Sequence, residues 1–478
     1  MSNRIIRQIL LCAISGVLLA LAFPKFNLYW LAWIALVPFF IALRRSKGLG
    51  ESLLCGLFFG IFFFGIHLSW VTSLFRFVEW WIILGWAALV LYQTLFIFLF
   101  VILLRFINPR RVLCAVPIAF LWVIVELLRA WGPFGVTGGD LGYSQAQLLP
   151  LIQIASFASV YGVSFLLALV NVTVSNLFIT FMSVRNKLGE IKFFPTVLVL
   201  VLVLALVIGC YAYGLWVMAT PSPIPHPSSL KLALIQPNVD QEDKLDPSKV
   251  MPIFELHEEM THQAMEEKPE IIIWPETAIF SYLLYDSRLL PRVKQLAIDS
   301  KAWLIFGTPH YIGDKAYNSV VSMSPSGEIV SRYDKQQLVP FGEYLPFRRI
   351  LFPLLKGVGY YDYEFSSNPD PELLSAADLK IAAAICFEST FPYLIRERAK
   401  KSSDFILTVT NDAWFGDSSA PYFHLNTGVF RAIENRRYFI QVGNTGLTAV
   451  IDPYGRILKE TKLNRREILA FELPLQVR

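Results

Sequence analysis

Three side chains in the C-terminal half have the types needed for acyl transfer through a thioester. A carboxylate, an amine and a thiol each follow a strand-like run: Glu276 in "IIIWPET", Lys335 in "SRYDK" and Cys386 in "AICFE". A thiol attacks a carbonyl as thiolate, so it needs a base, and Glu276 can serve if burial raises the pKa of its carboxyl toward neutrality. Lys335 can then stabilise the resulting oxyanion. The set predicts a nucleophilic acyl-transfer site that uses no histidine.

Each of these residues also has a simpler interpretation. Free cysteine is among the most buried residue types, so Cys386 alone would be a small core residue. A single ionisable residue at a strand end is most often an exposed charge. Two further acids repeat the pattern, however: Glu343 in "VPFGEY" and Glu388, two residues after the cysteine. This recurrence favours the reactive interpretation, as does the absence of any other cysteine after residue 220.

Strands that end in turns must position these side chains. Segments 248–267, 287–300, 391–401 and 420–436 predict helices between strand-like runs. The alternation predicts an α/β domain of about 245 residues, which is large enough for its own core. The runs that predict strands are "LKLALIQPNV", "EIIIWPETA", "AWLIFGTPHY", "KIAAAICFES", "DFILTVTNDAWF", "RYFIQVGNTG" and "TAVIDPYG".

The N-terminal half has the composition of a membrane protein. The whole chain of 478 residues is 55% hydrophobic and only 17% charged, which does not fit a soluble enzyme. Seven apolar stretches approach or exceed the roughly 17 to 25 residues that cross a bilayer as a helix. They cover residues 5–23, 28–43, 53–72, 80–104, 112–130, 157–181 and 194–219. We therefore predict a transmembrane helical domain of about seven spans over residues 1–219.

The basic residues predict how this domain is oriented. Residues 1–220 carry 14 Lys and Arg against 5 Asp and Glu, and 11 of these basic residues lie in the N-terminus and the loops that share its side. The N-terminus is therefore expected in the cytoplasm, with everything after an odd number of spans on the opposite side. The proline-rich stretch "TPSPIPHPSSL" predicts a linker at residues 220–229, followed by a catalytic domain at residues 230–475.

The motifs around these residues resemble those of a known family. "WPE", "YDK" and "ICFE" occur in this order, 59 and 51 residues apart, and resemble the Glu-Lys-Cys triad of the nitrilase, or carbon-nitrogen hydrolase, superfamily. "LVPFGEYLPFR", "TNDAWFG" and "GPFGVTGGDLGYSQ" resemble motifs of its membrane branch, the apolipoprotein N-acyltransferases. The resemblance covers nearly the whole chain, and it implies a multi-span domain followed by an α-β-β-α sandwich.

The resemblance implies a two-step reaction. Cys386 would take a fatty acyl group from a membrane phospholipid, and the thioester would pass it to the α-amine of the S-diacylglyceryl N-terminal cysteine of an apolipoprotein. Glu276 takes the role of the base, Lys335 that of the family's lysine, and Glu343 and Glu388 those of supporting acids. The resemblance implies no metal, cofactor or nucleic acid. It implies a bacterial inner-membrane protein with a periplasmic catalytic domain, expected to be a monomer.

Three further residues are candidates for substrate binding. Phe387 occupies a position where the family commonly has tyrosine, and it keeps the aromatic face without the hydroxyl. Trp414 could form a wall of the acyl pocket, although core packing explains it equally well. Asn411, like Trp414, follows a predicted strand. Leu245 occupies a position where the family commonly has tryptophan, so no binding role is assigned to it.

Two other functions fit parts of the sequence. A membrane-tethered nitrilase-type amidase or hydrolase would share the triad, with water resolving the thioester, although seven spans exceed what tethering requires. A transporter or scaffold would mark its path with ionisable residues inside the spans, and these are few here: His67, Glu126 and Arg129.

The C-terminal sequence departs from the family's usual pattern. Members usually close with an eighth transmembrane helix, whereas this chain ends in "REILAFELPLQVR", which is too short to span a bilayer. A seven-span member and a truncated sequence both fit this ending.

Overall fold

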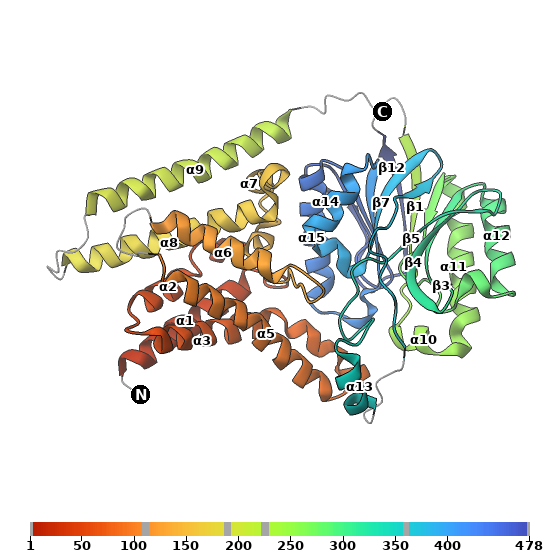
Figure 1. Cartoon of the computed structure of the whole chain (residues 1–478). Helices are drawn as coiled ribbons and strands as arrows, with labels where there is room; N and C mark the ends of the chain where they lie inside the picture. The colour runs from red at the N-terminus through yellow and green to blue at the C-terminus, as the bar shows by residue number, and fades with distance from the viewer. Residues whose placement is uncertain (1–2, 108–113, 186–192, 221–228, 357–362, 476–478) are drawn as a thin grey trace. The chain divides into compact units, whose positions relative to one another are not determined.

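The chain forms two compact units, which are described separately below (Figure 1). The computed structural model describes residues 3–107, 114–185, 193–220, 229–356 and 363–475. One unit comprises Met1–Thr220 with Ser418–Asn426, and the other comprises Pro221–Asp417 with Thr427–Arg478. Most of the predicted linker, residues 221–228, lies outside the described residues.

The first unit is helical because long runs of Leu, Phe, Ile and Val continue with few charges to interrupt them. Among the described residues, five helices are long and apolar enough to cross a membrane. The helices of this unit are α1 (Asn3–Leu21), α2 (Val37–Arg44), α3 (Leu49–His67), α4 (Phe75–Val78), α5 (Trp81–Leu104), α6 (Ala115–Arg129), α7 (Leu149–Ile152), α8 (Ala155–Arg185) and α9 (Phe193–Ala219). Its 3₁₀ turns are η1 (Tyr29–Trp33), η2 (Ser69–Leu74) and η4 (Leu141–Gln145).

Two of the seven stretches predicted to span the membrane form shorter helices than expected. The stretch 28–43 divides into the 3₁₀ turn η1 and the eight-residue helix α2, which has a proline in its first turn. The stretch 112–130 gives α6, of 15 residues, and its first two residues lie outside the described part of the chain. Both helices are shorter than a perpendicular span requires. The structure thus supports a multi-span domain, and the count of seven remains a prediction.

Small residues allow the long helices to approach one another closely. A Cβ atom on Gly16 of α1 would lie 2.7 Å from the Phe59 carbonyl oxygen of α3. A Cβ atom on Gly60 of α3 would lie 2.5 Å from Thr94 Oγ1 of α5. Packing of this kind is typical of helices that associate in lipid, where burial of apolar surface supplies little driving force.

The predicted in-span ionisable residues of α6 have structural partners. Glu126 accepts hydrogen bonds from Trp122 Nε1 and from the Leu141 backbone amide, both at 2.8 Å. Arg129 forms an ion pair with Asp140, and all three ionisable side chains are buried. These contacts hold the segment after α6 against the helix. Structural pairing therefore accounts for the charges of Glu126 and Arg129 without a transport path.

The second unit consists of two six-stranded sheets. One has the strand order β12-β1-β2-β3-β4-β5 and the other β11-β10-β9-β8-β7-β6. The neighbours β1–β2–β3 and β7–β8–β9 run parallel, and the other pairs are antiparallel. The strands are β1 (Ser229–Gln236), β2 (Ile271–Ile273), β3 (Trp303–Ile312), β4 (Lys315–Met323), β5 (Ile329–Asp334), β6 (Leu374–Ala376), β7 (Leu379–Ile385), β8 (Phe405–Thr410), β9 (Phe439–Gly443), β10 (Ala449–Ile451), β11 (Ile457–Glu460) and β12 (Glu467–Pro474).

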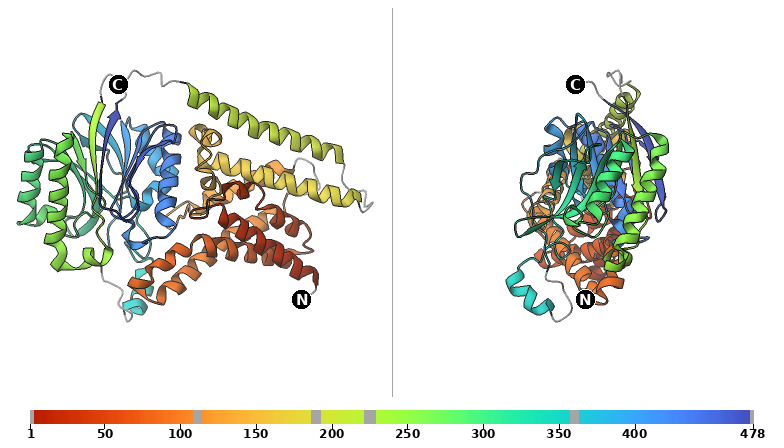
Figure 2. Two further views of the ribbon diagram at one scale, coloured as in Figure 1. Left: turned by 180° about the vertical axis from the view of Figure 1, so that it is seen from behind. Right: turned by 90° about the vertical axis from the view of Figure 1, so that its right-hand side faces the viewer.

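Helices cover the outer faces of both sheets (Figure 2). Phe254 of α11 and Val293 of α12 pack with Ala233 and Ile272 on the outer face of the first sheet. On the second sheet, α14 contacts β7, and Gly428 of α15 faces the Phe439 ring. The helices associated with this unit are α10 (Gln241–Leu245), α11 (Val250–Ala264), α12 (Leu289–Ser300), α13 (Arg348–Leu355), α14 (Pro392–Lys400) and α15 (Ala420–Asn435), of which α15 begins in the first unit.

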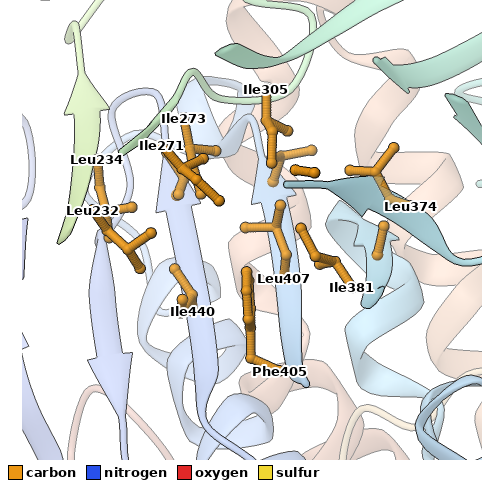
Figure 3. Packing of buried hydrophobic residues seen from close by; sticks show 14 of the residues in the cluster. Leu232, Leu234, Ile271, Ile273, Ile305, Leu374, Ile381, Phe405, Leu407 and Ile440 are labelled. Atoms are coloured by element: carbon orange, nitrogen blue, oxygen red, sulfur yellow. The ribbon is translucent and has the colours of Figure 1, made fainter. Parts of the chain in front are cut away.

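The core lies between the two sheets (Figure 3). Ile271 and Ile305 of the first sheet pack with Ile381, Leu407 and Ile440 of the second. The runs that predicted strands are continuously apolar because parallel central strands are covered on both faces. The predicted α-β-β-α sandwich is therefore confirmed.

The seven predicted runs leave out five strands: β4, β5, β6, β11 and β12, although "SRYDK" marked the end of β5. β6 has three residues, and all four residues of β11 are exposed, so neither carries an apolar run. β12 lies within "REILAFELPLQVR" and pairs antiparallel with β1. The four predicted helices are confirmed as α11, α12, α14 and α15, with ends shifted by at most three residues.

We expect a cavity between the sheets to destabilise the second unit. Leu407→Ala removes a side chain that is 1% exposed, and losses of this kind cost about 2 to 5 kcal/mol. The thermal unfolding midpoint of the detergent-purified protein should fall by roughly 5 to 15 °C. Leu458→Ala, at a position 43% exposed in β11, is the matched control and should leave the midpoint nearly unchanged. Equal shifts for the two variants would contradict the assigned core.

Candidate active site

Cys386 lies at the point where β7 ends and the 3₁₀ turn η9 (Cys386–Thr390) begins. It is half-buried and has no disulfide partner. Its backbone φ is +52°, in the left-handed region that non-glycine residues seldom adopt. Such strain persists only where the surrounding structure enforces it, and it is frequent at active sites.

Glu388 supplies much of this enforcement. Its fully buried carboxylate accepts hydrogen bonds from the Ile385 backbone amide at 2.8 Å and from the Gln336 and Gln337 amides at 2.8 and 3.0 Å. Tyr333 Oη donates to it at 2.7 Å. Glu388 therefore joins the turn that carries Cys386 to the segment that carries Lys335.

The ion pair with Arg398 completes the surroundings of Glu388. Arg398 Nη2 lies 3.2 Å from Glu388 Oε1, and both side chains are buried. Burial alone would raise the pKa of Glu388, but Arg398, Lys335 and the backbone amides together lower it below its usual value. Glu388 is thus an ionised structural anchor.

Lys335 lies between two carboxylates. It follows β5, is 1% exposed, and its Nζ lies 2.9 Å from Glu343 Oε1 and 3.7 Å from Glu276 Oε1. Asn318 of β4 donates to the same two carboxylates, at 2.8 Å to Glu276 and 3.0 Å to Glu343. Residues that lie far apart in the sequence thereby form one charge cluster, in which Glu276 and Lys335 are buried and Glu343 is partly buried. We call it the Glu-Lys-Glu cluster: Glu276, Lys335 and Glu343.

The charges in the cluster set its protonation. Burial raises the pKa of Glu276, and the negative charge of Glu343 raises it further, although Lys335 opposes both. Burial disfavours the charge on Lys335, yet Glu343 and Glu276 outweigh it and raise the pKa of the lysine above its usual value. Glu276 is therefore a carboxylate of raised basicity beside a fixed ammonium.

The thiol of Cys386 is uncharged in this setting. Burial raises its pKa well above the usual value, and the charge of Glu276 adds to this, while Lys335 acts in the opposite direction. A protonated thiol beside a carboxylate base can lose its proton during attack, when the negative charge passes to the substrate oxygen. The arrangement fits a thiol that becomes a nucleophile only when Glu276 removes its proton during attack on the substrate.

Asn411 lies against the base. Its backbone amide donates to Glu276 Oε2 at 2.9 Å. Its side chain donates to Gln241 Oε1 at 2.8 Å and accepts from Asn444 Nδ2 at 2.9 Å. Protein partners thus occupy both ends of the Asn411 side-chain amide, and the backbone amide of Asn411 helps to position Glu276. The role in substrate binding predicted for Asn411 stays a prediction.

The two aromatic candidates are Phe387, which follows Cys386 in the sequence, and Trp414, which lies in the turn after β8. Phe387 is half-buried, and its ring packs edge-on against Phe391 with the centroids 4.9 Å apart. Trp414 is half-buried in the 3₁₀ turn η10 (Asp412–Trp414) after β8. Their predicted role in substrate binding stays a prediction.

Sequence reasoning missed Asn318 and Lys244. Lys244 of α10 is 2% exposed and its Nζ donates to the Glu276 carbonyl oxygen at 3.2 Å. Burial lowers the pKa of Lys244 to about 7, with Glu276 acting in the opposite direction. "QEDKLD" is so polar that it reads as an exposed turn, so the sequence gives no signal for this residue.

Two family models match the chain. The model described as "Carbon-nitrogen hydrolase" matches residues 231–478, and the one described as "Apolipoprotein N-acyltransferase N-terminal domain" matches residues 15–173. The first covers about half of the chain and contains every candidate site residue.

Full-length relatives are also similar to the chain. An apolipoprotein N-acyltransferase of Geobacter metallireducens is 35% identical over 98% of this chain and 90% of its own length. One from Pseudomonas aeruginosa is 31% identical over 98% of this chain and 90% of its own length. One from Chlorobaculum tepidum is 28% identical over 100% of this chain and 93% of its own length.

Solved structures are similar to about half of the chain. Nit3 of Saccharomyces cerevisiae, a member of branch 10 of the nitrilase superfamily, is 20% identical, with a TM-score of 0.41 over 52% of this chain and 90% of its own. An amidase from Nesterenkonia sp. is 19% identical, with a TM-score of 0.40, and the similarity covers 53% of this chain and 94% of the amidase. On the family models and the full-length relatives, the chain belongs to the apolipoprotein N-acyltransferase family and carries the carbon-nitrogen hydrolase domain of that family.

Proposed function

We propose that this protein transfers a fatty acyl chain from a membrane phospholipid to the α-amine of the S-diacylglyceryl N-terminal cysteine of apolipoproteins. The observation that carries the proposal is the Glu-Lys-Glu cluster, in which the charges of the buried Glu276 and Lys335 act on the Cys386 thiol. Membership of the family supports the choice of donor and acceptor, since the full-length relatives bear the name of this activity.

The first half-reaction forms the thioester. Glu276 takes the thiol proton as the Cys386 sulfur attacks the phospholipid ester carbonyl, and Lys335 stabilises the oxyanion. The C–O bond then breaks, and Glu276 returns the proton to the departing lysophospholipid oxygen. Glu343 and Asn318 hold Lys335 and Glu276 in place, so their contribution is geometric and electrostatic.

The second half-reaction forms the amide. The acceptor nitrogen attacks the thioester carbonyl, the C–N bond forms and the C–S bond breaks. Glu276 takes a proton from the nitrogen and passes it to the sulfur, which restores the thiol. A thioester is activated toward amines, so this direction of transfer is downhill.

The chain is a bacterial membrane protein, as its relatives and five long apolar helices indicate. We further propose residues 1–219 as the transmembrane domain, 220–229 as the linker and 230–475 as the catalytic domain. Inner-membrane location, a cytoplasmic N-terminus, a periplasmic catalytic domain and a monomeric state belong to the same proposal. The excess of basic residues in alternate loops supports this orientation.

Product analysis tests the proposed function. The purified full-length protein is incubated with phospholipid vesicles and a peptide bearing an S-diacylglyceryl N-terminal cysteine, and the products are identified by mass spectrometry. The proposal predicts an N-acylated peptide and lysophospholipid in equal amounts. Free fatty acid without N-acylated peptide would instead indicate a hydrolase.

Cys386→Ala should abolish the acyl-enzyme. Wild-type protein incubated with phospholipid should carry an acyl group that neutral hydroxylamine removes, because thioesters react with hydroxylamine and amides do not. Intact mass before and after hydroxylamine provides the measurement. Cys12→Ala, which alters a cysteine of the transmembrane domain, is the control and should label normally. Acylation that persists in Cys386→Ala would refute the mechanism.

Lys335→Gln should slow formation of the acyl-enzyme by roughly 100- to 1,000-fold, the usual cost of losing one preorganised oxyanion donor. The rate constant comes from intact-mass samples taken during a single turnover with phospholipid. Lys315→Gln, an exposed lysine of β4, serves as the control and should load at the wild-type rate. A Lys335→Gln protein that loads normally but fails in transfer would show that the lysine acts in the other half-reaction.

The acid limb of the pH profile should report Glu276. Loading needs the ionised carboxylate, so its rate should fall as the pH drops through a pKa raised above the ordinary value of about 4.3 for glutamic acid. Glu343→Gln removes a negative charge that raises this pKa, so the acid limb should move to lower pH, whatever happens to the maximal rate. Glu364→Gln, in a partly exposed ion pair with Arg348, should not move it. An unchanged acid limb in Glu343→Gln would remove Glu276 from the assignment.

A further inference from the structure

Asp412 is a second carboxylate beside the nucleophile, and the reaction described above does not use it. It begins the turn η10 after β8 and its side chain is fully buried. One of its carboxylate oxygens lies within 4.8 Å of Cys386 Sγ. The carboxylate therefore lies close to the atom that would carry the acyl group.

The local structure fixes this carboxylate. Thr410 Oγ1 donates to Asp412 Oδ1 at 3.2 Å, and Thr410 also acts to lower the pKa of the Cys386 thiol, so it lies beside both groups. On the other side, a Cβ atom on Gly446 would lie 2.4 Å from Asp412 Oδ2, so any side chain at that position would displace the carboxylate. Asp412 is thus held in one place relative to the sulfur.

Its charge opposes the first half-reaction. Glu276 and Asp412 both raise the pKa of Cys386. Among the strongest influences on the thiol, Lys335 is the cation that lowers this pKa. A second negative charge beside the sulfur makes the thiolate harder to form and repels an anionic phosphate. The Asp412 carboxylate is thus unfavourable for forming the thioester. Its place beside the thiol is explained if it acts on the acyl acceptor in the second half-reaction.

The acceptor supplies the matching charge. An α-amine has a pKa of about 7.7 to 8.0, so it arrives largely as an ammonium, and a buried carboxylate binds an ammonium through a charge-assisted hydrogen bond. We propose, on the basis of the proposed function, that Asp412 binds the α-ammonium of the acceptor beside the Cys386 thioester.

The protons balance in this scheme. The ammonium releases its extra proton through the Asp412 carboxylate to water, which leaves a neutral amine. The amine then attacks the thioester carbonyl, the C–N bond forms, the C–S bond breaks, and the second nitrogen proton passes through Glu276 to the sulfur.

The two half-reactions measured separately test the role of Asp412. Full-length Asp412→Asn protein is first loaded from phospholipid vesicles, and the acyl-enzyme is quantified by intact mass. The loaded protein then receives either the S-diacylglyceryl peptide or neutral hydroxylamine, a nucleophile that is uncharged at neutral pH. Asp417→Asn is the matched control, because it removes the same charge from the exposed end of the same segment.

We expect Asp412→Asn to load at least as fast as wild type and to react with hydroxylamine at the wild-type rate. Transfer to the peptide should fall by roughly 10- to 100-fold, the range for loss of a hydrogen bond to a charged group, and Asp417→Asn should match wild type throughout. Wild-type transfer in Asp412→Asn would overturn the proposal, and so would an equal loss of loading, hydroxylamine release and transfer. If wild-type protein itself fails to load, the proposed function falls and the role of Asp412 falls with it.

Discussion

The buried ion pairs of Lys335 are the interaction on which the rest of the site depends. Removing an ammonium from water costs several kcal/mol, and the cost is recovered only where carboxylates and further hydrogen bonds surround it closely. Here Glu343 at 2.9 Å, Glu276 at 3.7 Å and the bridging amide of Asn318 meet that condition. The elements that carry these residues must all be in place before the lysine can be buried, so the fold and the site form together.

The strained turn at Cys386 is connected to the same cluster. Glu388 accepts the amide of Ile385 before the cysteine and the amide of Gln336 after the lysine, so one carboxylate fixes the distance between nucleophile and cation. Arg398 offsets the charge of Glu388 in an ion pair of 3.2 Å. The active-site geometry is thus determined mainly by groups that never need to touch a substrate, as preorganised electrostatic catalysis requires.

The sequence predicted the residues that follow buried strands and missed those that depend on tertiary contact. Glu276 and Cys386 each end a continuous apolar run, and Lys335 ends a strand beside them, so their types and order were sufficient. Asn318 sits in a strand whose mixed polarity hides it, and Lys244 sits in a turn that resembles solvent-exposed sequence. Asn411 was found, but its partners Gln241 and Asn444, which occupy its side chain, could not be read from spacing. The seven apolar stretches likewise gave the membrane domain but not the division of 28–43 into two short helices.

The ionisation of Cys386 tests the account most directly, because every role assigned to the cluster assumes a neutral thiol that Glu276 deprotonates during attack. The rate of alkylation of Cys386 by iodoacetamide in the full-length protein, measured against pH by peptide mass spectrometry, gives the pKa of the thiol. A neutral thiol in this site should give an inflection above the ordinary value of about 8.5 for cysteine. An inflection at or below that value, as in thiols held as thiolates by a neighbouring cation, would contradict it.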